Sequence, residues 1–153
     1  MEIAGMDIAD LLEPGRVVLD IRARDKAHLL ADLARLAAGH APPVAAASIE
    51  AALLAREQLG STGLGAGFAL PHARIEGLRQ WLGLFVRLTR PIDFDAIDGK
   101  PVDLLFLLLI PAGMAEHVSA LAAVSRRFRD SAMVGKLRKC TTPTAAYALL
   151  TEV

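Results

Sequence analysis

Apolar side chains recur with helical spacing along several stretches of the chain. The clearest stretch follows Asp25, where apolar residues repeat every three or four positions as far as Gly39, which predicts a helix with one apolar face. A second helix is expected from about Ser48 to Leu59, after the two prolines at 42–43. The same spacing predicts further helices over 8–12, 118–128, 132–139 and 145–150.

Other segments have the composition and spacing of β-strands. The β-branched run 17–21 predicts one strand, and the alternation over 81–89 predicts another. Residues 102–110 are almost continuously apolar, as in a central strand that is buried on both faces. Pro71 cannot donate a backbone hydrogen bond, so the segment that ends at His72 is expected at a sheet edge or a strand end. Because helices alternate with about four strands, the sequence predicts a single layered α/β domain over 1–153.

Composition and charge exclude several classes of protein. Seventeen Lys and Arg balance seventeen Asp and Glu, so there is no general attraction to nucleic acid or to an anionic membrane. The single cysteine, Cys140, excludes an intramolecular disulfide framework and a multi-cysteine metal site. The longest apolar stretch, 104–115, is interrupted by a proline and is too short to span a membrane, and the first residues lack the pattern of a secretory signal. We expect a cytoplasmic protein with no nucleic-acid partner and no membrane insertion.

One uncharged segment holds most of the candidate chemistry. Residues 58–73 contain no Asp, Glu, Lys or Arg, yet they include four glycines, two hydroxyl side chains and one histidine. Glycines let backbone N–H groups approach an oxyanion closely, and Ser61 and Thr62 add hydroxyl donors. The spacing is not that of a dinucleotide-binding fingerprint, because Phe68 stands where the third glycine is needed. The loop around Gly63 is therefore a candidate phosphate-binding segment.

Two histidines and one arginine are further candidates. His72 follows the glycine-rich segment, and His117 precedes a predicted helix. Two imidazoles suit nucleophilic phosphoryl transfer, in which one neutral ring attacks and the other donates a hydrogen bond to the transferred group. Arg56, at the end of a predicted helix, either stabilises the helix C-terminus or binds a phosphoryl oxygen. With a carboxylate the same histidines would instead form a zinc site, so residue type alone leaves both chemistries open.

Three motifs and one longer stretch occur in order along the chain. The motifs are Arg56-Glu57 with Gly60-Ser61-Thr62-Gly63, then Leu70-Pro71-His72, and then His117-Val118-Ser119-Ala120-Leu121. They resemble the enzyme IIA domains of the bacterial phosphotransferase system, in the fructose/mannitol class. The stretch 91–106 is similar to the nitrogen-regulatory enzyme IIA proteins in particular, and the resemblance covers nearly the whole chain.

The resemblance implies a mixed β-sheet flanked by helices and a phosphotransferase activity that needs no metal and no cofactor. His72 would accept a phosphoryl group from the phosphohistidine of an HPr-like or NPr-like carrier protein, with His117 as the neighbouring imidazole. A partner would dock on an apolar rim, for which we expect Leu64, Phe68, Leu70 and Met114. The residues implied to hold the phosphoryl oxygens are Arg56, Ser61, Thr62 and Gly63.

The resemblance also favours a regulatory role. A sugar-transport role needs a IIB protein and a membrane IIC component, neither of which this sequence encodes, so we expect a regulator whose targets include nitrogen-control and potassium-transport proteins. The alternatives are an enzyme IIA component of a fructose/mannitol-type transporter and a binding module of the same fold that does not turn over phosphate. Ala66 and Ala73 stand where the family often has Asn and Gly, and Ala66 gives the binding module some support.

Overall fold

The continuous apolar segment 102–110 forms the central strand of the sheet in a computed structural model that describes residues 6–114 and 118–152. This strand, β6 (Val102–Pro111), pairs antiparallel with β5 (Leu82–Ile92) on one side. On its other side, β3 (Phe68–Ala69) and β4 (His72–Ile75) pair with it in parallel. The predicted central position of this strand is therefore confirmed.

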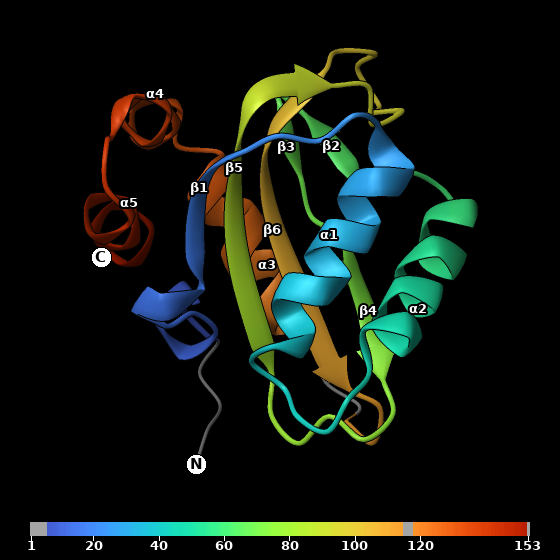
Figure 1. Cartoon of the computed structure of the whole chain (residues 1–153). Coiled ribbons are helices and arrows are strands. Elements are labelled where there is room, and N and C mark those ends of the chain that lie inside the picture. Colours follow the sequence, from blue (N-terminus) through green and yellow to red (C-terminus); the bar gives the residue numbers. More distant parts are fainter. Residues whose placement is uncertain (1–5, 115–117, 153) are drawn as a thin grey trace.

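The outer strands complete a six-stranded mixed sheet with the order β1-β5-β6-β3-β2, in which β4 also pairs with β6 (Figure 1). β1 (Val17–Ile21) has the predicted bounds and runs parallel to β5. β2 (Gly63–Gly65) pairs antiparallel with β3, so the glycine-rich segment predicted as a loop contains a short hairpin. The single strand expected to end at His72 is two strands, and His72 begins the second.

β3 and β4 lie one after the other along the same side of β6, with an interruption between them. Phe68 pairs with Leu104 and His72 pairs with Leu108, so the register is the same before and after the interruption. Within the interruption the backbone carbonyl of Pro71 accepts a hydrogen bond from the Leu108 amide at 2.9 Å. Pro71 has no N–H to donate to this ladder, which agrees with its place between the two strands and outside both of them. His72 lies at a strand end and on an edge strand, as expected, but it is the first residue of β4 and does not end the preceding strand.

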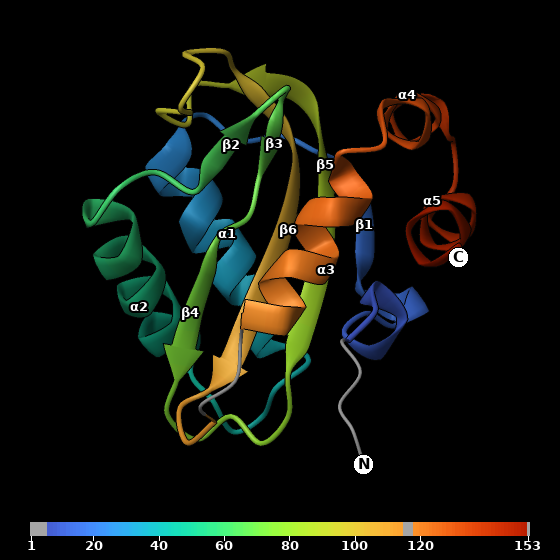
Figure 2. The same ribbon diagram turned by 180° about the vertical axis from the view of Figure 1, so that it is seen from behind.

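Helices cover both faces of the sheet. α1 (Lys26–Ala38) and α2 (Ala46–Gln58) lie on one face, and α3 (Val118–Phe128) crosses the other (Figures 1 and 2). α4 (Ser131–Lys139) and α5 (Pro143–Thr151) lie beside β1. The helix expected over 8–12 is only a 3-10 turn, Ile8–Asp10, followed by another at Pro14–Arg16. The layered α/β prediction is confirmed.

The strand pattern divides the core into two apolar layers. Alternate residues of β6 face opposite sides, so Leu105, Leu107 and Leu109 pack under α1 and α2. Phe106 and Leu108 pack on the other side, with α3 and the C-terminal helices. β5 is buried on both faces from Leu82 to Val86, more than its alternating sequence predicts.

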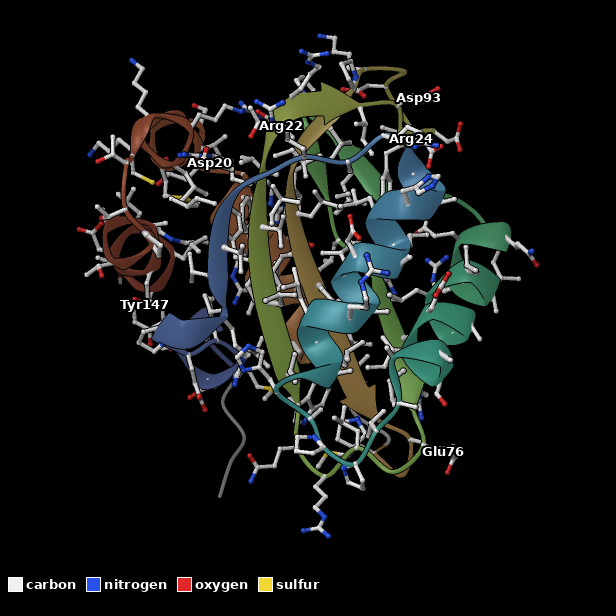
Figure 3. All side chains as sticks on the ribbon, viewed as in Figure 1. Asp20, Arg22, Arg24, Glu76, Asp93 and Tyr147 are labelled. Atoms are coloured by element: carbon white, nitrogen blue, oxygen red, sulfur yellow. The ribbon has the colours of Figure 1, made fainter. Side chains whose placement is uncertain are left out.

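Side-chain hydrogen bonds fix the ends of several helices. Asp25 caps α1 by accepting from the backbone N–H of His28, and this hydrogen bond together with the His28 ring lowers the pKa of Asp25. Asp130 and Thr142 cap α4 and α5 in the same way. Tyr147 of α5 donates to the Leu12 carbonyl at 3.5 Å and lies toward the N-terminal turns (Figure 3). Among the described residues, no helix combines the length and hydrophobicity that a bilayer-spanning segment requires.

Candidate functional site

A surface hollow of about 440 Å³ lies between the C-terminal half of α2 and strand β4. These two elements lie side by side at one edge of the molecule (Figure 2). On the α2 side, part of its wall consists of the small side chains of Ala52 and Ala55. Its lining residues are Ala52, Ala55, Arg56, Leu59, His72, Ala73, Arg74 and Ile110.

His72 enters this hollow from the first position of β4. Its backbone pairs with Leu108, which places its side chain on the face of the sheet that α3 covers. The ring nitrogen Nδ1 lies 2.8 Å from the backbone carbonyl oxygen of Leu70. A carbonyl oxygen only accepts hydrogen bonds, so Nδ1 carries the proton in the neutral ring. The lone pair of the neutral imidazole is then on Nε2, which is the nitrogen able to act as a nucleophile.

Two arginines give the hollow a positive character. Arg56 lies in the last turn of α2, and its Nη1 donates to the Gly60 carbonyl at 3.0 Å. Arg74 projects from β4 on the same face as His72, and its Nη1 donates to the Met114 carbonyl at 2.9 Å. None of the described residues that line the hollow is acidic. A guanidinium presents a planar fork of donors that matches phosphoryl oxygens, so the arrangement favours a phosphate-like anion beside His72.

The structure brings Arg56 and His72 together but places the other predicted phosphate ligands outside the lining of the hollow. The Ser61 hydroxyl donates to the Phe94 carbonyl at 2.8 Å and accepts from the Gly63 amide at 3.0 Å. Thr62 is 2% exposed and donates both its amide and its hydroxyl to the Glu57 carboxylate. In this structure these residues hold the turn between α2 and β2.

His117 lies outside the described residues, so its predicted place beside His72 is not tested. Within the described part of the chain, no three or more His, Cys, Asp or Glu side chains are arranged to hold a metal ion. The chemistry of the described site therefore rests on one imidazole and two guanidinium groups.

Sequence reasoning missed Arg74 and the role of Glu57. Arg74 could have been found, because residues two apart on a strand face the same side and His72 was already a candidate. Glu57 is part of a recognised motif, but no local pattern shows that its side chain is only 6% exposed and paired with Lys26 at 2.9 Å. That pairing depends on the packing of α1 against α2.

The predicted docking rim is partly wrong. Phe68 and Leu70 are 5% and 3% exposed, because both pack into the core layer beneath α3. Leu64 and Met114 are exposed as expected. Leu59, which was not predicted, is 84% exposed and lines the hollow directly.

Ala66 has an unusual backbone conformation in the β2–β3 hairpin. Its φ angle is 56°, in the left-handed region that alanine adopts less readily than Asn or Gly. The hairpin is held by Asp98, which accepts from the Ala66 amide at 3.0 Å, and by Arg138, which donates to the Ala66 carbonyl at 2.9 Å. The amides of Ala66 and Lys100 lower the pKa of Asp98. An Asn at position 66 would fit this backbone, so the alanine affects local strain at a point outside the lining of the hollow.

Comparisons with known proteins agree with the fold and the motifs. The family described as "Phosphoenolpyruvate-dependent sugar phosphotransferase system, EIIA 2" matches residues 10–153. A nitrogen regulatory protein of Bradyrhizobium diazoefficiens is 42% identical over 146 residues, which cover 95% of this chain and 95% of that protein.

Solved structures give the same result. The nitrogen regulatory protein IIA-Ntr of Neisseria meningitidis is 36% identical, with a TM-score of 0.88, and the match covers 94% of this chain and 99% of that one. Enzyme IIA-mannitol of Escherichia coli, solved in complex with phosphorylated enzyme IIB-mannitol, is 18% identical with a TM-score of 0.78 over 91% of this chain and 96% of its own. The latter similarity shows the fold alone.

Proposed function

This chain belongs to the EIIA type-2 family of the phosphoenolpyruvate-dependent phosphotransferase system, and from that premise we propose that His72 accepts a phosphoryl group from an HPr-like or NPr-like carrier protein. The observation that carries the proposal is the geometry of His72. Its Nδ1–H is bonded to the Leu70 carbonyl, and His72 lines the same hollow as Arg56 and Arg74. A nucleophilic nitrogen and cations for the transferred group are thus held by neighbouring elements.

In the proposed step, Nε2 of His72 attacks the phosphorus atom of the carrier's phosphohistidine in line. The new N–P bond forms as the carrier's N–P bond breaks, and the carrier imidazole keeps the electron pair of the broken bond. Because donor and acceptor are both imidazoles, the protein needs to supply mainly positioning and charge stabilisation. Arg56 supplies that charge from α2, and Arg74 supplies it from β4.

Two predicted roles are retained as proposals. We propose His117 as the neighbouring imidazole, on the basis of its sequence motif. The direct phosphoryl-binding role of Ser61, Thr62 and Gly63 stays a prediction. In this structure the two hydroxyls and the Gly63 amide are hydrogen-bonded within the protein, so they would have to exchange these partners for a phosphoryl oxygen.

We also propose a regulatory role in the cytoplasm. The full-length relatives named nitrogen regulatory protein support it, and the proposed targets are nitrogen-control or potassium-transport proteins. Phosphorylation adds nearly two negative charges at His72, so the two forms would differ in their affinity for a target. The complex of enzyme IIA-mannitol with phosphorylated enzyme IIB-mannitol supports a second candidate, transfer onward to a IIB-type protein.

The test is phosphorylation of the purified chain by phosphoenolpyruvate, enzyme I and an HPr-type carrier, followed by intact-mass measurement. We expect one acid-labile addition of about 80 Da that requires the carrier. No addition with any cognate carrier would contradict the proposal and leave the non-phosphorylated binding module. Stoichiometric zinc in the same preparation would instead favour a metal site.

Arg56→Ala is expected to lower the maximal rate of phosphoryl transfer about 100-fold, because the transition state loses a guanidinium beside the transferred group. Arg56→Lys is expected to recover only part of this loss, since an ammonium cannot form the bidentate fork. The measurement is the single-turnover rate from phosphorylated carrier. Arg22→Ala is the matched control, because Arg22 follows β1 at the opposite edge of the sheet (Figure 3). An unchanged rate in Arg56→Ala would remove Arg56 from the mechanism.

A further inference from the structure

A nearly buried ion pair lies beneath the turn that joins α2 to β2. The Glu57 side chain is 6% exposed, and its Oε1 lies 2.9 Å from Nζ of Lys26 at the start of α1. The Lys26 ammonium also lies 3.6 Å from Asp95 and 4.5 Å from the centre of the Phe94 ring. Burying a carboxylate is costly unless it is paired and hydrogen-bonded. Moving Lys26 or another partner away from Glu57 would therefore be unfavourable, and this keeps the partners of Glu57 in place.

The Glu57 carboxylate also accepts two hydrogen bonds from a single residue, Thr62. Its Oε1 accepts the Thr62 amide at 3.1 Å, and its Oε2 accepts the Thr62 hydroxyl. These two hydrogen bonds to a charged acceptor fix both the backbone and the side chain of Thr62. Thr62 is therefore oriented by α2.

The orientation of Thr62 is passed to His72 through two further hydrogen bonds. The Thr62 carbonyl accepts from the Leu70 amide at 2.9 Å, and the Leu70 carbonyl accepts from Nδ1 of His72 at 2.8 Å. Leu70 is 3% exposed, so it has little freedom to adopt another orientation. A continuous series of contacts runs from the Lys26–Glu57 pair to the ring that we propose as the phosphoryl acceptor.

We propose that Glu57 is a positioning residue for His72: through Thr62 and Leu70 it holds the imidazole in the Nδ1–H form, with the Nε2 lone pair directed for attack. The inference rests on the proposed function only where it predicts a change in the rate of phosphoryl transfer to His72. Its direct consequence, the proton position on His72, exists in the unphosphorylated protein. Lys26 supports the same role because its ion pair with Glu57 holds the Glu57 side chain in place.

The test compares Glu57→Gln with Glu50→Gln, a control on the same helix. Gln keeps the shape of Glu but its amide NH₂ group cannot accept the second hydrogen bond from Thr62. ¹⁵N spectra of the His72 ring, assigned with the His72→Gln protein, report which nitrogen carries the proton. Glu57→Gln is expected to shift the ring toward the Nε2–H form and to lower the maximal transfer rate about tenfold, with KM within about twofold of wild type. Glu50→Gln is expected to match wild type in both.

A purely structural role would give a different result. Glu57→Gln would then lower only the midpoint of thermal unfolding, and an unchanged ring proton together with an unchanged maximal rate would overturn the proposal. If Glu57→Gln does not fold, Thr62→Val gives the same spectroscopic test, with Thr62→Ser expected to restore the wild-type ring spectrum. A wild-type chain that takes no phosphate but loses the Nδ1–H form on Glu57→Gln would contradict the proposed function alone.

Discussion

His72→Ala is expected to abolish phosphorylation of the chain by its carrier while leaving the fold intact. Ala cannot supply a nucleophilic nitrogen, and His72 is the only histidine among the described residues that line the hollow. The structural cost is expected to be small because His72 is only partly buried and lies on β4, at the edge of the sheet. The measurement is the acid-labile addition of about 80 Da, taken at equal concentrations of carrier.

His40→Ala is the matched control, since His40 is an exposed histidine after α1 and does not line the hollow. It is expected to take up phosphate like the wild type. Both proteins should have urea unfolding midpoints close to that of the wild type, so that lost labelling reports chemistry and not unfolding. Undiminished labelling of His72→Ala would assign the acceptor to another residue and would remove the basis of the proposed mechanism.

Phe106→Ala is expected to lower the free energy of unfolding by about 3–5 kcal/mol. Phe106 is fully buried in the centre of β6, and its ring meets Phe128 of α3 edge to face with 6.5 Å between centroids. The ring also lies over Gly83, where a Cβ would be only 2.9 Å from it and 2.6 Å from the Leu11 carbonyl. The strands are therefore packed around this ring, and they cannot collapse readily into the cavity that its loss leaves.

The measurement is urea denaturation, with the slope of the transition compared between variants. Leu64→Ala is the control, because Leu64 is half exposed on β2 and its loss is expected to change stability by about 0.5 kcal/mol or less. A loss below about 1 kcal/mol in Phe106→Ala would show that the layer between β6 and α3 is loosely packed, contrary to the structure.

The sequence was sufficient for the long elements, because their patterns are local. The bounds of β1, the central place of β6 and the face of α1 follow from the spacing and composition of their own residues. β2 and β4 were not predicted, because two of the three residues of Gly63–Gly65 are glycines and His72–Ile75 has only four residues. Their neighbours in the sheet define these strands more than their own sequences do.

The candidate site divides in the same way. His72 and Arg56 could be selected by residue type and motif, and the structure places them in one hollow. The Lys26–Glu57 contact joins two helices and cannot be read from either one. Phe68 and Leu70 were expected on the surface, but both pack into the core layer on the α3 side of the sheet, Phe68 through its register with β6.

The shared register of β3 and β4 along β6 has a consequence for how a phosphorylated form could be recognised. A strand edge locked into a central strand on both sides of Pro71 has little freedom to shift when charge is added at its next residue. A partner would then detect phosphorylation mainly through the electric field of the phosphoryl group on His72. Mobile ions screen this field over about 8 Å at physiological ionic strength. A partner that distinguishes the two forms therefore has to place its own charges within about that distance of the ring.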